Sequence, residues 1–97
     1  MAEKISNLDL ADMLDSDEII EAFLTEAMES GDAKLIAASL GTVARAKGMT
    51  NIAKKTGLAR EHLYTSLSEN GNPTLETTLA VLKALGFHLA PKHDATG

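Results

Sequence analysis

The chain has 97 residues, a formal net charge of −5 and no cysteine. That length supplies one small hydrophobic core, and the lack of cysteine excludes disulfides and thiolate metal sites. Abundant Leu, Ala and Ile, few aromatic residues and scattered β-branched residues are typical of helices, so we predict an all-α protein. The sequence contains no apolar run long enough for a signal peptide or a membrane span, and we expect a soluble, cytoplasmic protein.

Charge is distributed unevenly along the chain. From Met1 to Leu40, ten acids and two lysines give a net charge of −8, whereas five bases and one acid from Gly41 to Leu67 give +4. Such asymmetry indicates two partners: a polyanion for the centre and a cationic surface for the N-terminal part. The alternative is that these are ordinary solvated charges on helix surfaces.

The first predicted helix is acidic. Asp15 or Ser16 can cap it, and Gly31 can end it. Its apolar residues repeat at intervals of three to four and form one face: Ile19, Ile20, Phe23, Leu24, Ala27 and Met28. We therefore predict that residues 1–31 form an acidic N-terminal arm and helix that packs on the rest of the protein.

Three further helices are predicted in the centre of the chain. One extends from its cap, Asp32, through Lys47, and Gly41 inside it marks a close approach of another helix. A short helix begins at Thr50 as cap and ends before Gly57, and another covers residues 59–67.

The last predicted helix begins with Asn72 as cap and Pro73 in the first turn, and it ends at Gly86. Its regular spacing predicts an inward stripe made of Leu75, Leu79, Leu82 and Leu85. A short strand is predicted at residues 87–90, followed by a flexible tail over residues 91–97.

Residues 50–67 have the spacing of a helix-turn-helix. The turn requires a residue that tolerates positive φ, supplied by Gly57, and a small residue four positions earlier, supplied by Ala53. Four apolar residues then occupy inward positions: Ile52, Leu58, Leu63 and Leu67. We predict that residues 32–90 form a helix-turn-helix DNA-binding domain of four helices, on which the acidic helix packs as a fifth.

The outward residues of the predicted recognition helix suit DNA. Arg60 can donate two hydrogen bonds to guanine, and Glu61 either accepts from a cytosine amino group or only stabilises the first turn. The candidate DNA-binding residues on this helix are Ala59, Arg60, Glu61, His62, Tyr64 and Thr65. Those placed along the DNA backbone are Thr50, Asn51, Lys54, Lys55 and Asn72, although the two lysines are equally compatible with a solvated surface.

The stretch "LIAASLGTVARAKGMTNIAKKTGLAREHLYTSLSENGNPTLETTLAVLKALGF" resembles the addiction-module antidote proteins, which are antitoxins with a phage-repressor-type helix-turn-helix. The resemblance extends from about Leu14 to Leu89. It implies an antitoxin of a type II toxin–antitoxin pair that neutralises a small basic toxin similar to the RelE/ParE group. It also implies repression of the protein's own operon by a homodimer bound to operator DNA. Ala59 stands where the family pattern has a serine, so one polar contact is missing there.

The resemblance gives the acidic helix a role in toxin binding. Its apolar face and its acids suit an apolar groove rimmed by lysine and arginine. The candidate toxin-binding residues are Ile19, Phe23, Leu24, Met28, Glu18 and Glu21. The alternative is that this face packs only on its own domain.

Two other functions remain open: a stand-alone repressor without a toxin partner, and an acidic protein-binding inhibitor that does not bind DNA. For the homodimer, Leu85 and the predicted strand at residues 87–90 are candidate contacts. The three histidines are not spaced with carboxylates as metal ligands, and no nucleophile has a neighbouring base. We therefore expect no enzyme activity, no metal and no cofactor.

Overall fold

The computed structural model describes residues 14–94, and this part of the chain consists of five helices without a strand. They are α2 (Asp17–Ser30), α3 (Ala33–Lys47), α4 (Met49–Thr56), α5 (Arg60–Ser66) and α6 (Leu75–Ala84). The all-α prediction is confirmed. The predicted arm over residues 1–13 and the last three residues of the tail lie outside the described part. None of the described helices has both the length and the apolar character needed to cross a membrane.

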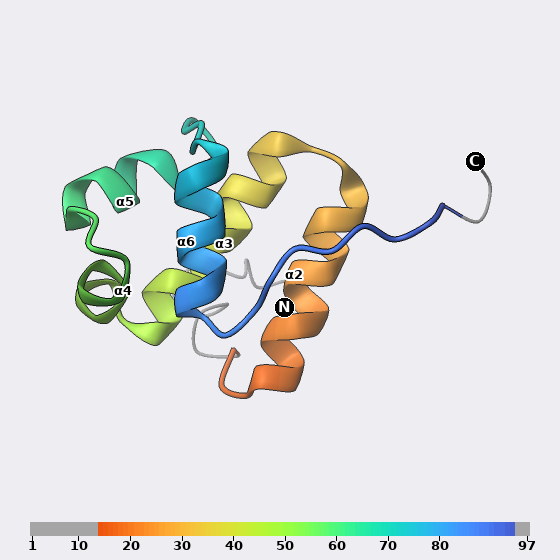
Figure 1. Cartoon of the computed structure of the whole chain (residues 1–97), viewed down its shortest axis with the longest axis horizontal. Helices are drawn as coiled ribbons and strands as arrows, with labels where there is room; N and C mark the ends of the chain where they lie inside the picture. Colours follow the sequence, from red (N-terminus) through yellow and green to blue (C-terminus); the bar gives the residue numbers. More distant parts are fainter. Residues whose placement is uncertain (1–13, 95–97) are drawn as a thin grey trace, which may run out of the picture.

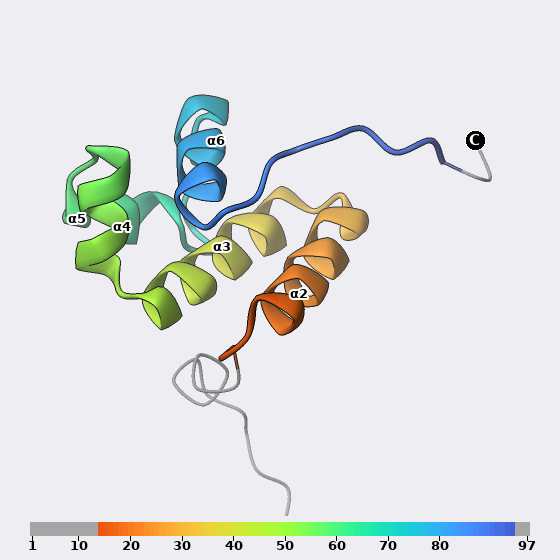
Figure 2. The ribbon, with the colours of Figure 1, turned by 60° about the horizontal axis from the view of Figure 1, so that its bottom comes forward.

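Helix α3 is the centre of the arrangement, because α2, α4 and α5 all pack against it. Figure 1 shows α2 on one side of the molecule and the pair α4 and α5 on the other, with α6 in front of α3. Helix α6 packs mainly on α4. In Figure 2 it stands at the outer edge of the molecule, so one of its sides faces away from the other helices.

Local capping explains where most helices begin and end. Ser16 accepts a hydrogen bond from Ile19 N at 3.2 Å and begins α2, and Gly31, with φ 68°, ends it. Asp32 accepts from Lys34 N at 3.0 Å and begins α3. Helix α4 follows Gly48 without a side-chain cap, so the predicted capping role of Thr50 was wrong.

We expect Asp32→Ala to lower the free energy of unfolding by about 1 kcal/mol, because two N–H groups in the first turn of α3 lose their acceptor. Asp32→Asn keeps an acceptor oxygen and should lose much less. Thermal unfolding followed by circular dichroism measures both variants. Equal losses in the two would show that the cap does not stabilise α3.

The start of α6 differs from the prediction. Asn72 and Pro73 lie before the helix, and Thr74 is its cap, accepting from Thr77 N at 3.0 Å. Both Asn72 and Thr74 are residue types that cap helices. The Thr74 hydroxyl makes a second hydrogen bond at the same helix end, because it donates to Thr77 Oγ1 at 3.1 Å.

The predicted strand at residues 87–90 does not form, and this segment is irregular. Phe87 N donates to Leu82 O at 2.8 Å, and Gly86, at φ 91°, turns the chain out of the helix. The backbone of Phe87 thus closes α6, and its side chain packs against the core. No second extended segment pairs with residues 87–90 within the described chain.

The core is formed by apolar residues from all five helices and the segments beside them. The predicted inward residues Ile52, Leu63 and Leu67 are buried, and Leu58 is partly buried. The buried core cluster consists of Leu14, Ile20, Leu24, Leu40, Val43, Ala44, Met49, Ile52, Leu63, Leu67, Val81 and Leu82.

Half of the predicted leucine stripe on α6 was wrong. Leu82 is buried and Leu85 partly buried, but Leu75 and Leu79 are 67% and 43% exposed. Helix α6 buries Thr77 and Val81 as well as Leu82. Leu82 lies on the same line of the helix as Leu75, two turns further on, so the leucine stripe is buried only toward the C-terminal end of α6.

Candidate nucleic-acid interface

A tight turn joins α4 to α5. Gly57 has φ 76°, as the spacing predicted, and its N–H donates to Ala53 O at 2.9 Å. The Thr56 hydroxyl donates to Ile52 O at 2.8 Å and accepts from Leu58 N at 3.2 Å. These bonds fix the direction in which the chain leaves α4, and therefore the orientation of α5.

Helix α5 is anchored by one side only. Its buried residues are Leu63 and Ser66, and Leu67 at its end is also buried. The predicted recognition residues lie on the remaining surface, and all six are exposed: Ala59 at the cap position, then Arg60, Glu61, His62, Tyr64 and Thr65. The structure thus brings them together on a single exposed surface of one short helix.

Arg60 is held in place by two neighbours. Its Nη1 donates to Thr50 Oγ1 at 3.2 Å, and its guanidinium carbon lies 5.6 Å from the centre of the Tyr64 ring. Ala59, Arg60, Glu61 and Tyr64 line an open depression of about 340 Å³. The hydrogen bond links residues ten positions apart, across the turn, and no local sequence pattern indicates it. Four of the five guanidinium N–H donors remain for a ligand.

Helix α4 carries two pairs of polar residues, and the two members of each pair lie one helical turn apart. Thr50 and Lys54 share the side that carries the contact with Arg60, whereas Asn51 and Lys55 line a depression that also includes Asp17 of α2. All four are exposed. Within residues 14–94, neither lysine forms an ion pair with a carboxylate. The remaining candidate, Asn72, is exposed in the loop between α5 and α6.

The candidate toxin-binding residues of α2 are divided between surface and core. Glu18, Glu21 and Ile19 are exposed, Phe23 and Met28 are partly buried, and Leu24 is buried in the core. A groove of about 430 Å³ lies between α2 and the C-terminal segment. Its lining includes Glu21, Leu24 and Met28 from α2, and Leu82 and Phe87 from the other side.

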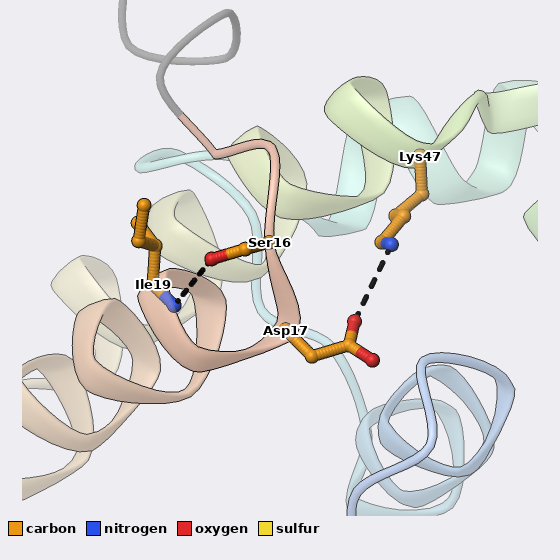
Figure 3. Close-up of polar contacts among 4 residues, drawn as sticks. All are labelled: Ser16, Asp17, Ile19 and Lys47. Carbon is orange, nitrogen blue, oxygen red and sulfur yellow. Dashed lines mark hydrogen bonds and ion pairs between the residues drawn. The ribbon is translucent and has the colours of Figure 1, made fainter.

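Within residues 14–94, one exposed ion pair joins the acidic helix α2 to the end of α3. Lys47 Nζ, at the end of α3, lies 3.5 Å from Asp17 Oδ1, one residue after the Ser16 cap (Figure 3). A second exposed pair joins Lys92 to Glu29 at 3.6 Å. Solvent screens such pairs, so each contributes little to stability.

Charge therefore separates in space as well as in sequence. Helix α2 carries five acids and no base, whereas α4 and α5 together carry three bases and one acid. Figure 1 places these two groups on opposite sides of α3. Among residues 14–94, no three His, Asp or Glu side chains gather as a metal site would require.

Comparison with known proteins agrees with these features. A family model described as "Probable addiction module antidote protein" matches residues 4–93. A protein of Haemophilus influenzae, described as uncharacterized, is 42% identical over 87 residues, which is 90% of each chain. No solved structure matches the chain. Since the family model covers nearly the whole sequence, the chain belongs to the addiction module antidote family.

Proposed function

We propose that the protein is the antitoxin of a type II toxin–antitoxin pair, and that it binds operator DNA through α4 and α5 and a small basic toxin through the acidic side formed by α2. Membership of the antidote family supports the antitoxin role. The observation that carries the DNA-binding part is the exposed polar surface of α5, on which Arg60 is held by Thr50 and Tyr64.

In this proposal α4, the Gly57 turn and α5 act as a helix-turn-helix, with α5 in the major groove. Arg60 is long enough to offer two parallel hydrogen bonds to O6 and N7 of a guanine. Because Thr50 and Tyr64 already restrict its side chain, less conformational entropy is lost on binding. Lys54, Lys55 and the amide of Asn72 then contact phosphates and position the helix without reading sequence.

The toxin surface in this proposal is the groove beside α2 and its acidic rim. Leu24 and Met28 supply an apolar floor, and Glu21 lies at its edge. Glu18 and Ile19 extend the exposed surface toward the start of the helix. A small basic toxin of the RelE/ParE type offers lysines and arginines of complementary charge. Since α2 and α5 lie on opposite sides of α3, one chain can contact toxin and DNA together.

A homodimer completes the proposed repressor. One short helix buries too little DNA surface for tight specific binding, whereas two copies related by two-fold symmetry read a palindrome. Repression of the antitoxin's own operon then requires both α5 helices to lie on one face of the dimer.

We expect Arg60→Ala to weaken specific operator binding by about 1–3 kcal/mol and to leave toxin binding unchanged. The loss has two causes. The guanine contact disappears, and Tyr64 loses the Arg60 guanidinium that lies over its ring. Gel-shift titration with the DNA upstream of the gene measures the change, and capture of the toxin tests the second part.

The matched control is Lys34→Ala, which removes one exposed positive charge from α3 outside the proposed interface. It should change operator affinity much less than Arg60→Ala. Operator binding that is unchanged in Arg60→Ala would remove Arg60 from the readout. Equal weakening by both variants would mean that only total charge matters.

A further inference from the structure

The outer side of α6 carries an apolar patch that no described helix covers. Leu75 and Leu79 are 67% and 43% exposed and lie one turn apart. Of the six exposed large apolar side chains in the described part of the chain, they are the only two on the same helix. The residues that α6 buries are others, namely Thr77, Val81 and Leu82.

Two opposite charges lie on either side of Leu79 along α6. Glu76 and Lys83 are both exposed, and they are seven residues apart, which places them on the same line of the helix two turns from each other. Neither forms an ion pair within residues 14–94. Leu79 lies between them on the same outer side. The α6 patch, defined as Leu75, Glu76, Leu79 and Lys83, thus has an acid beside Leu75 in the first turn, Leu79 in the middle and a base in the last turn.

We propose that the α6 patch binds the α6 patch of a second copy of the chain, with the two helices antiparallel around a two-fold axis beside Leu79. In that arrangement Glu76 of each copy faces Lys83 of the other, and Leu79 lies at the centre. Leu75 then meets the end of the other helix near Ala84. A two-fold interface repeats each contact, so Leu79 of both copies forms the apolar centre and Leu75 of each copy adds an apolar contact at one end.

The charges of the α6 patch favour a second copy of the chain, rather than the proposed toxin, as its binding partner. A basic toxin would be attracted by an excess of acid, as on α2, whereas the α6 patch has one acid and one base. These two charges complement an antiparallel copy of themselves and repel a parallel one. None of the α5 residues proposed to bind DNA belongs to the patch. The α6 patch thereby supplies a contact surface for the homodimer of the proposed function, although the pairing itself does not require DNA binding.

The test exchanges the two charges and follows the mass of the full chain by sedimentation equilibrium. The wild-type chain should form a dimer. Glu76→Lys and Lys83→Glu should each weaken dimerisation by roughly tenfold, because each places two pairs of like charges in contact. An equimolar mixture of the two variants should dimerise again, since every facing pair is then opposite in charge. The double variant Glu76→Lys/Lys83→Glu should also dimerise like the wild type.

The matched control is Glu26→Lys, which makes the same charge change on an exposed residue of α2. It should leave the mass unchanged, and circular dichroism should show all variants folded. A monomeric wild-type chain, single reversals that dimerise normally, or a mixture that stays monomeric would each overturn the α6 interface.

Different results would contradict the proposed function and the α6 interface. A chain that dimerises through the α6 patch but shifts no operator DNA would contradict the repressor role and leave the interface intact. A chain that binds DNA and toxin, with a mass unaffected by the charge reversals, would contradict only the α6 interface.

Discussion

Leu63→Ala is expected to lower the free energy of unfolding by about 2–5 kcal/mol and to abolish operator binding. Leu63 is fully buried and is the large apolar side chain that anchors α5 from within the helix. A helix of seven residues is not stable without tertiary contacts. Loss of this anchor therefore removes both stability and the fixed orientation of the exposed surface of α5.

Urea unfolding followed by circular dichroism measures the stability of Leu63→Ala, and a gel shift measures its operator binding. The matched control is Leu35→Ala on α3, because Leu35 is 46% exposed. That change should alter stability by no more than about 0.5 kcal/mol. Similar stabilities for the two variants would contradict the inward orientation of Leu63.

Gly41→Ala is expected to cost about 2–3 kcal/mol of stability, although alanine is the better helix former by about 1 kcal/mol. Gly41 is buried inside α3, and a Cβ there would overlap the carbonyl oxygen of Leu67. That atom belongs to the backbone at the end of α5, so no side-chain rotation can make room. The two segments must move apart. The midpoint of thermal unfolding should fall by roughly 10 °C or more.

Gly31→Ala is the matched control, since it makes the same substitution at a glycine with open space around it. Gly31 has φ 68°, and a Cβ there would meet no heavy atom within 4 Å. Only backbone strain remains, at about 1–2 kcal/mol. A neutral or stabilising Gly41→Ala would show that α3 and the end of α5 do not approach as closely as described.

Local signals explain the parts of the fold that the sequence predicted. Ser16 and Asp32 cap the helices that follow them, and Gly31 and Gly57 end the helices before them. These roles depend on residues within a few positions of each other. The interpretation of Gly41 as a point of close packing is also confirmed, because the backbone at the end of α5 leaves no room for a Cβ there.

The structure differs from the prediction where the outcome depends on contacts between residues far apart in the sequence. Periodicity placed four leucines on one side of α6, but it cannot say that only Leu82 and Leu85, toward the C-terminal end of the helix, are covered by the core. The predicted strand required a partner strand, and Phe87 instead closes α6. In the candidate site, residue types indicated the exposed side of α5, whereas the hydrogen bond from Arg60 to Thr50 depends on how the turn brings α5 back to α4.

The most direct test of the antitoxin role is to co-express the chain with the reading frame adjacent to its gene and to purify the chain by affinity. The purified material is then tested for binding to the DNA upstream of that gene at two salt concentrations. We predict a stable complex with a small basic protein that shifts this DNA, with binding that weakens steeply as salt increases. A chain that captures no such protein, or a complex that does not shift the DNA at either salt concentration, would contradict an antitoxin that represses its own operon.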